Sequence, residues 1–220
     1  MAGRGPDRQA RRRRTPEAAE EEILEAAREV FYERLGEGVT VSAIMDRTTL
    51  SRKSFYVYFR SLEELIVRLV ARIRNDADAA ITRFLSPDSD PIADGKAALR
   101  ATAELYHRHG ALIRALAESS RADPEAKRAW QSFTDPVKAA IAERYRVEGQ
   151  AGRIADVDVD ATVRVLIGMN LTAFFEQLID EQDPDVDALV DTLHKVWVRV
   201  FFAGTDAEAA ARDAGGEAAA

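Results

Sequence analysis

The side chains best suited to recognise another molecule lie in one short segment, residues 51–60, with the sequence SRKSFYVYFR. Arg52 and Lys53 are hydrogen-bond donors that match the O6 and N7 acceptors of guanine. Phe55 and Phe59 are four residues apart, so on a helix they share one face and can pack inward. The basic residues then point outward. A short helix of this kind suits insertion into the major groove of DNA.

A second short helix is predicted immediately before this segment. Ala43 and Ile44 supply its apolar positions, and Leu50 provides an apolar anchor in the turn that follows. Thr40 and Ser51 have the side chains expected at the N-caps of the two helices. Two short helices joined by a tight turn, the second with a polar outward face, form a helix-turn-helix pattern.

The stretch S-R-K-S-F-Y-V-Y-F, followed by R-S-L-E-E-L, resembles the recognition helix and the start of the linking helix in the TetR family of one-component transcriptional regulators. The resemblance covers residues 23–69. It implies an all-α fold, a homodimer, a palindromic DNA operator and a small-molecule effector. The family usually has glycine where this chain has Thr49, which puts a β-branched residue where a positive φ is expected. It also often has a phosphate-binding lysine where this chain has Leu62, so that contact is either lost or supplied by Arg60.

The recognition pattern and the resemblance together give a set of candidate DNA contacts. Some would contact bases or their sugar edges, others would hold phosphates, and one caps the recognition helix. The candidates are Arg52, Lys53, Ser42 and Tyr56 for bases, Thr40, Ser54, Tyr58 and Arg60 for phosphates, and Ser51 as the cap.

The charge distribution favours DNA binding although the chain as a whole is acidic, with a net charge of −7. Residues 1–60 carry 12 Lys and Arg against 10 Asp and Glu, and eight of those acids fall within residues 17–37. The rest of the chain has a net charge of −9. A DNA-binding face needs local positive potential, so the basic residues of the head are compatible with an acidic body.

The composition excludes several classes of protein. There is no cysteine, so thiolate metal sites, disulfides and cysteine nucleophiles are excluded, and a cytoplasmic location is expected. No run of about 18 apolar residues predicts a membrane span. Catalytic motifs and phosphate-binding glycine loops are missing, and His107 and His109 point to different faces of a helix. We therefore expect neither an enzyme nor a cofactor.

Four regions are predicted along the chain. Residues 1–15 form an arginine-rich arm, which either lies along DNA or is a solvated tail. Residues 16–61 form the helix-turn-helix domain, residues 62–204 a helical effector-binding and dimerisation domain, and residues 205–220 a disordered tail. The helices expected in the second and third regions are 62–85, 92–108, 111–121, 124–148, 158–181 and 184–203, with a break at His109–Gly110.

The last two of these helices are the predicted dimer element, because their apolar faces are wider than one small domain needs. Pairing with a second copy would bury the excess in a four-helix bundle. The residues on these faces are Val163, Leu166, Ile167, Asn170 (the one polar member), Leu171, Phe174, Phe175 and Leu178 in the first helix, and Val186, Leu189, Val190, Leu193, Val196, Trp197, Val200 and Phe201 in the second.

The segments D-P-E-A-K-R-A-W-Q-S-F and D-T-L-H-K-V-W-V resemble the ethionamide-resistance repressor branch of the family. That resemblance implies an apolar ligand tunnel lined by aromatic side chains and an asparagine. Asn170 would either cap a backbone group or bind a ligand. The aromatic residues are either core or cavity lining, and a filled interior would favour a DNA-binding or architectural protein without an effector. The candidate ligand contacts are Tyr106, Trp130, Phe133, Asn170, Phe174 and Trp197.

Overall fold

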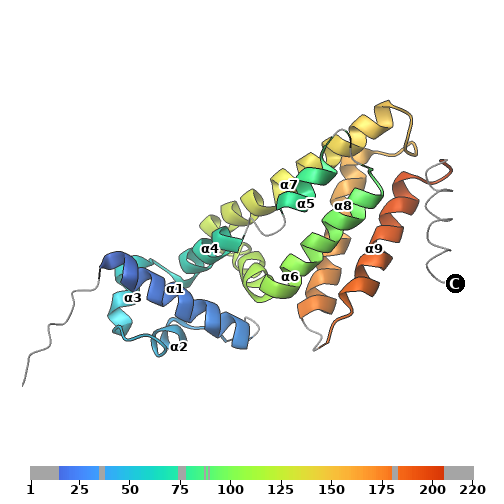
Figure 1. Ribbon diagram of the computed structural model, residues 1–220. Coiled ribbons are helices and arrows are strands. Elements are labelled where there is room, and N and C mark those ends of the chain that lie inside the picture. The colour runs from blue at the N-terminus through green and yellow to red at the C-terminus, as the bar shows by residue number, and fades with distance from the viewer. Residues whose placement is uncertain are drawn as a thin grey trace, which may run out of the picture.

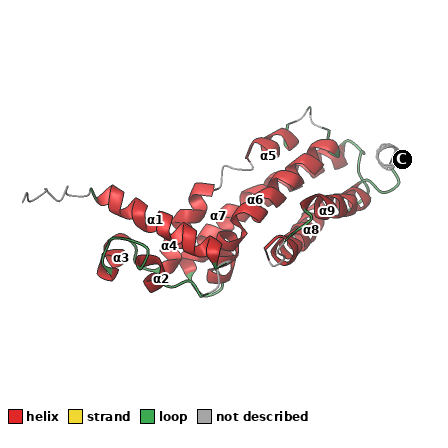
Figure 2. Cartoon of the chain, turned by 60° about the horizontal axis from the view of Figure 1, so that its bottom comes forward, coloured by secondary structure: helices red, strands yellow, loops and turns green. Residues whose placement is uncertain are grey.

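The computed structural model describes residues 15–34, 38–73, 78–86, 88, 90–179 and 183–205. Within these ranges the chain forms helices joined by loops and has no strand (Figures 1 and 2). The predicted all-α class is therefore confirmed. The predicted arm and tail, apart from their end residues Thr15 and Thr205, lie outside the described ranges.

The N-terminal head consists of α1 (Pro16–Glu33), α2 (Val41–Met45) and α3 (Arg52–Tyr58). α1 begins as predicted, because the hydroxyl of Thr15 accepts a hydrogen bond from the backbone nitrogen of Ala18 (3.3 Å) and a proline follows at the first helical position. Phe55 and Phe59 are both buried, with ring centroids 5.4 Å apart. Their inward packing fixes which face of α3 points to solvent.

The connection between head and body is α4 (Leu62–Ile73). Its buried residues Leu65, Ile66 and Leu69 belong to one hydrophobic core that contains residues of α1 to α4 and continues into the body. The predicted helix 62–85 is described as two helices, α4 and α5 (Asp78–Phe84), and residues 74–77 between them lie outside the described ranges. The predicted domain boundary at residues 61 and 62 stays a prediction, because α4 packs on both parts.

The body is built from α6 (Ala93–Ser119), α7 (Pro124–Gln150), α8 (Val159–Phe174) and α9 (Val186–Phe201), and the π-helical turn η2 (Phe175–Ile179) continues α8 (Figure 1). The predicted break at His109–Gly110 is wrong, because α6 runs through both residues. Gly110 is buried against Ile179 of η2, so the missing side chain permits close helix packing. The other helix boundaries agree within a few residues.

Most apolar residues assigned from sequence to the dimer element are buried within the protomer itself. Val163, Leu166 and Phe174 of α8, and Leu193 and Trp197 of α9, belong to the cores of this chain. The outward faces of these helices carry mainly small, polar or isolated apolar residues: Val165, Gly168 and Thr172 on α8, and Ala188, Thr192, Lys195 and Arg199 on α9. None of the helices in the described ranges has the length and apolar character needed to cross a lipid bilayer.

Candidate DNA-binding surface and ligand cavity

The outward face of α3 is open to solvent. Arg52 and Lys53 are exposed in its first turn, and neither forms an ion pair with any described residue. Tyr56 and Val57 follow one turn later and are 61% and 76% exposed. Val57 was not predicted as a DNA contact, although it follows Lys53 by four residues and therefore lies on the same face of α3. An exposed valine on a recognition helix can contact a thymine methyl group, so it extends the candidate surface.

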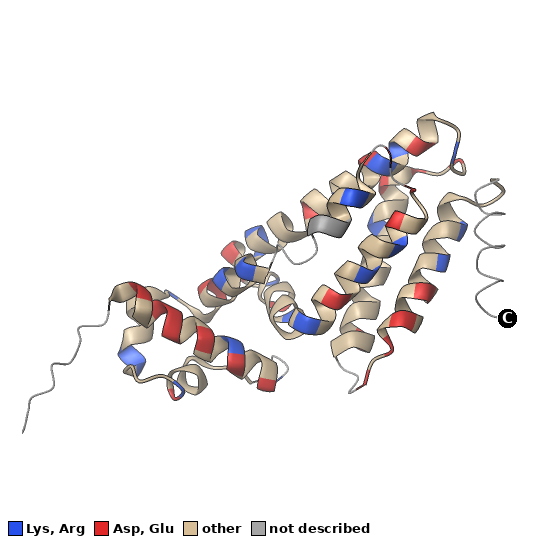
Figure 3. Ribbon diagram, in the orientation of Figure 1, with Lys and Arg blue, Asp and Glu red and all other residues tan. Residues whose placement is uncertain are grey.

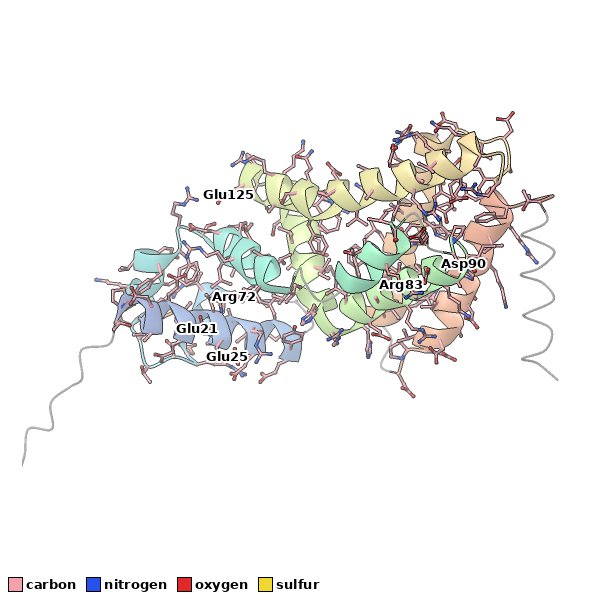
Figure 4. All side chains as sticks on the ribbon, turned by 45° about the horizontal axis from the view of Figure 1, so that its top comes forward. Glu21, Glu25, Arg72, Arg83, Asp90 and Glu125 are labelled. Carbon is pink, nitrogen blue, oxygen red and sulfur yellow. The ribbon has the colours of Figure 1, made fainter. Side chains whose placement is uncertain are left out.

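Other arginines of the head are engaged by the acidic residues of α1, which form red bands along that helix (Figure 3). Glu21 binds Arg72 of α4 through two hydrogen bonds of 2.8 Å, and Figure 4 shows the two side chains facing one another. Glu20 binds Arg68 (2.6 Å), and Glu33 binds Arg47 (2.6 Å). These arginines are therefore held within the protein, whereas Arg52 and Lys53 at the start of α3 have no carboxylate partner among the described residues.

The predicted polar contacts around α3 fall into two groups. The hydroxyl of Thr40 caps α2 by accepting from the nitrogen of Ala43 (3.2 Å), as predicted. Ser51 occupies the N-cap position of α3, but its hydroxyl bonds the hydroxyl of Ser54 (2.9 Å) and does not cap the backbone. Ser42, Ser54 and Tyr58 are half-buried, and Tyr58 packs against the core. The exposed Thr40 and Ser51 thus suit DNA contact better than the three half-buried residues.

Arg60 follows the C-cap of α3 and is held by two carboxylates. Its guanidinium donates to Glu64 of α4 (2.9 Å) and to Glu125 in the first turn of α7 (2.8 Å). Both neighbours raise the pKa of Arg60, with the hydrogen bond to Glu64 as the main cause. The Glu64 carboxylate also accepts from the backbone nitrogen of Arg60, while its own nitrogen donates to Ser61 (3.3 Å). A phosphate would have to replace at least one of these partners.

The body encloses an apolar cavity of about 380 Å³ between α5, α6, α7, α8 and α9. A volume of this size lies within the range of small-molecule pockets. Phe84 of α5 forms part of the wall and approaches Gly95 of α6, where a Cβ atom would lie 3.4 Å from its ring. Two polar contacts hold α5 in place: Arg83 donates to Asp94 of α6 (2.6 Å), and Arg144 donates to the carbonyl of Phe84 (3.3 Å). Figure 4 shows where Arg83 and Asp90 lie at this end of the body.

Asn170 of α8 is a buried polar group in the cavity wall, with 7% of its surface exposed. Its side-chain oxygen accepts a hydrogen bond from Nε1 of Trp197 (3.2 Å). Because an indole nitrogen only donates, this contact fixes the orientation of the amide. The NH₂ group of Asn170 has no hydrogen-bond partner among the described residues, so it can donate to a ligand.

Five of the six predicted ligand residues line this cavity. The sixth, Trp130, does not line it; its ring packs against Phe133 with centroids 6.2 Å apart. Sequence reasoning missed the polar lining residues Thr134, Lys138 and His194. The five that line the wall are Tyr106, Phe133, Asn170, Phe174 and Trp197.

His194 of α9 is the histidine in this wall. Its Nε2 lies 3.0 Å from the carbonyl oxygen of Ile92, and since a carbonyl only accepts, Nε2 carries the proton. Burial lowers the pKa of His194 below its ordinary value of 6.5, and Lys96 adds to the effect, although the Ile92 hydrogen bond, Asp191 and Asp90 oppose it. Within the described ranges, no group of three or more His, Cys, Asp or Glu residues could hold a metal ion.

A three-helix head with an exposed basic recognition helix, fixed to a helical body, belongs to the DNA-binding transcriptional regulators of helix-turn-helix type. Two family models match the chain: "Bacterial regulatory proteins, tetR family" over residues 23–69, and "Transcriptional regulator EthR, C-terminal domain" over residues 96–203. The chain belongs to the TetR family of regulators and is EthR-like in its body.

Individual proteins agree with this assignment. The HTH-type transcriptional regulator EthR of Mycobacterium tuberculosis is 27% identical over 186 residues, covering 82% of this chain and 85% of that protein. Two solved structures share the fold. PfmR of Thermus thermophilus has a TM-score of 0.66 and 20% sequence identity, and the match covers 81% of this chain and 97% of PfmR. The fatty acid degradation regulator FadR of Bacillus halodurans has a TM-score of 0.64 and 16% sequence identity, and the match covers 84% of this chain and 95% of FadR. The matched proteins are regulators and not enzymes.

Proposed function

We propose that this regulator is a repressor released from DNA by a hydrophobic small molecule that binds in the cavity of the body. The observation that carries this proposal is the open, apolar space of about 380 Å³ beside a buried asparagine with an unused donor. A protein with no effector would gain stability by filling that space, because empty volume in a core is costly. The cavity therefore favours a ligand-responsive regulator over a purely architectural one.

In this proposal the apolar part of the ligand packs against the aromatic wall, and the NH₂ group of Asn170 donates to an acceptor on the ligand. Tyr106 and Phe174, with ring centroids 5.0 Å apart, form one side of the wall. Phe133 forms part of another, and Trp197 orients the amide. Apolar contact supplies affinity and the amide supplies selectivity.

The DNA contacts in this proposal are centred on the start of α3. Arg52 and Lys53 donate to base edges, with Tyr56, Ser42 and the newly identified Val57 beside them, while Thr40, Ser51, Ser54 and Tyr58 contact the sugar-phosphate backbone. Arg60 joins the backbone contacts when it leaves its carboxylate partners. The exposure of Arg52 and Lys53, and their freedom from ion pairs in the described chain, support this assignment.

A physical link between ligand and DNA runs through α7. The middle of this helix lines the cavity with Phe133, Val137 and Ile141, and its first turn carries Glu125, which binds Arg60 beside the recognition helix. Figure 4 shows Glu125 at the end of α7 near the head. A ligand that prefers one position of α7 would change how strongly Glu125 holds Arg60. Such a preference shifts the equilibrium between DNA-binding and released conformers.

We also propose that two copies pair through α8 and α9. TetR-family regulators bind their operators as dimers, and the outward faces of these helices carry small side chains, together with Val165 at 69% exposure, that permit close approach. A two-fold pair would present two α3 helices to a palindromic operator, about 34–36 Å apart. Val165→Asp would place two charges in that contact, so analytical ultracentrifugation should show a shift toward monomer.

The central proposal is tested by a thermal-shift screen of hydrophobic molecules, followed by titration of hits against protein bound to an operator selected from randomised duplexes. Thr102→Phe fills the cavity and should abolish both the thermal shift and DNA release. Gln131→Ala, an exposed position on α7 outside the lining, is the control and should leave both unchanged. Stabilisation that survives in Thr102→Phe would place the ligand elsewhere. A full screen without hits, on protein that binds DNA, would favour the effector-free regulator.

A further inference from the structure

The described lining of the cavity carries a single formal charge. Among the described residues that line it, Lys138 of α7 is the only one with a formal charge, and there is no Asp, Glu or Arg among them. The hydroxyl of Thr134 beside it donates to the carbonyl of Trp130 (3.1 Å), whereas the NH₂ group of Asn170 has no partner among the described residues. The wall thus offers hydrogen-bond donors and one cation to whatever binds there.

Lys138 lies where an amphipathic molecule would place its head. Its side chain is 32% exposed, whereas Phe174 and Trp197 deeper in the cavity are 1% and 8% exposed. A lysine on a helix that borders an apolar space commonly keeps its ammonium near water and lays its stem on apolar surface. An apolar chain in the cavity would then leave a polar end beside the Lys138 ammonium.

The present partners of Lys138 can be replaced. Nζ lies 3.0 Å from Oδ1 of Asp135 and 3.2 Å from the hydroxyl of Thr134, one turn earlier on the same helix. Asp135 is 58% exposed, and exposed ion pairs three residues apart on a helix contribute little stability. A carboxylate brought to this place by burial of its apolar chain would compete well with Asp135.

We propose that the cavity selects amphipathic molecules with a single carboxylate head group, such as long-chain monocarboxylic acids, and that Lys138 binds the head. This inference rests on the proposed function, because it names the class of effector for the same cavity. Neutral analogues would bind through the apolar wall alone. Cationic amphiphiles would meet the Lys138 ammonium and find no carboxylate in the lining.

The test compares dodecanoate, 1-dodecanol and dodecyltrimethylammonium, each below its micelle-forming concentration, by calorimetric titration of the full-length protein. Wild-type protein should bind dodecanoate about tenfold more tightly than dodecanol, which corresponds to one charge-assisted hydrogen bond. Lys138→Gln should lose this preference and keep its affinity for dodecanol. Asp135→Asn, which removes the competing carboxylate, should bind dodecanoate more tightly. Lys127→Gln, on the same helix outside the cavity, is the control.

Two outcomes overturn the inference, and they can be told apart from failure of the proposed function. Equal affinity for dodecanoate and dodecanol in wild-type protein, or an unchanged preference in Lys138→Gln, would show that Lys138 forms no carboxylate site. Either result leaves the proposed apolar ligand cavity unaffected. If none of the three amphiphiles binds, or if Thr102→Phe binds them as well as wild-type protein does, the cavity is not their site and the inference fails; the thermal-shift screen then decides whether the proposed function fails as well.

Discussion

The carboxylate of Glu22 on α1 accepts two hydrogen bonds from Thr49 in the turn between α2 and α3, one from the backbone nitrogen (2.6 Å) and one from the hydroxyl (2.8 Å). Family members usually have glycine at this turn position. A threonine supplies a hydroxyl that glycine lacks, and Glu22 uses it to tie the turn to the first helix. The departure from the family pattern is thus matched by a specific contact.

Removing the Glu22 carboxylate should loosen the head. Glu22→Ala removes both of these hydrogen bonds to Thr49, so the free energy of unfolding should fall by about 1–2 kcal/mol in urea titrations followed by circular dichroism. Glu22→Gln keeps one acceptor and should lose less. Glu25→Ala removes only an exposed pair with Arg28 and should change stability by less than about 0.5 kcal/mol. Identical losses in the two alanine variants would show that the Thr49 contact carries no special stability.

Arg52 should read sequence, because it is exposed at the start of α3 and has no carboxylate partner in the described chain. Arg52→Ala should cost about 1–3 kcal/mol on the selected operator and little on random duplexes, as measured by fluorescence anisotropy. Arg47→Ala is the matched control, since Arg47 is held by Glu33. Equal loss of affinity for the operator and for random duplexes would show that Arg52 contacts phosphate and does not read bases.

Glu125 should restrain DNA binding through Arg60. Glu125→Gln removes the charge that holds the guanidinium, so DNA affinity should rise about two- to fivefold at low salt, a size typical of exposed ion pairs. Its salt dependence should steepen, because one more arginine contacts phosphate. Glu143→Gln, near the other end of α7, should change neither. Loss of the Glu125→Gln effect in an Arg60→Gln background is expected. A rise that persists without Arg60 would assign the effect to another contact.

The head could be predicted in detail because its signals are local. The Thr40 cap and the inward spacing of Phe55 and Phe59 each act within a few residues, and the structure shows them as predicted. Thr49 could be recognised as unusual from the sequence. Its partner could not, since Glu22 lies 27 residues away along the chain and the two are brought together by packing of α1 against α2.

The body was less predictable because its signals depend on tertiary partners. Glycine is a residue typical of helix breaks, yet Gly110 lies within α6 and packs against η2. Lys138, one turn from Asp135 and Thr134, has the sequence pattern of a solvated helix face, and only the fold shows that it borders a cavity. The apolar residues of α8 and α9 could pack within one chain or between two, and the structure buries most of them within one.

His194 should make the protein less stable in mild acid. Burial holds its folded pKa below 6.5, so as the pH falls through 6.5 the unfolded chain takes up a proton that the folded protein resists. The stability that comes from keeping His194 neutral is fully present above this pH and is lost as the pH falls through the folded pKa. The free energy of unfolding should fall by at most about 1.4 kcal/mol per pH unit, and by less because the side chain is partly exposed. Urea unfolding from about pH 7 to about pH 5 should show a flatter profile for His194→Gln. Exposed His107→Gln is the control, and an unchanged slope in His194→Gln would exclude this role.

Gly110 should be intolerant of even a methyl group. In an open helix, Gly→Ala stabilises by about 1 kcal/mol because alanine loses less conformational freedom on folding. A Cβ atom at Gly110 would collide with the Cγ1 and Cδ1 atoms of Ile179, and overpacking of this kind costs about 1–3 kcal/mol. Gly110→Ala should therefore be net destabilising. Gly149→Ala, whose Cβ would only reach ordinary contact with Ile154 (3.4 Å), should be neutral or stabilising.

The cause is isolated by a double-mutant cycle measured in urea. Ile179→Ala alone leaves space beside Gly110, and the double variant Gly110→Ala/Ile179→Ala should be more stable than the sum of the two single losses predicts, because each change relieves the other. Additive losses would mean that the methyl group at position 110 is accommodated without meeting Ile179. A coupling of about 1 kcal/mol or more would show that the missing side chain of Gly110 is what allows η2 to pack closely on α6.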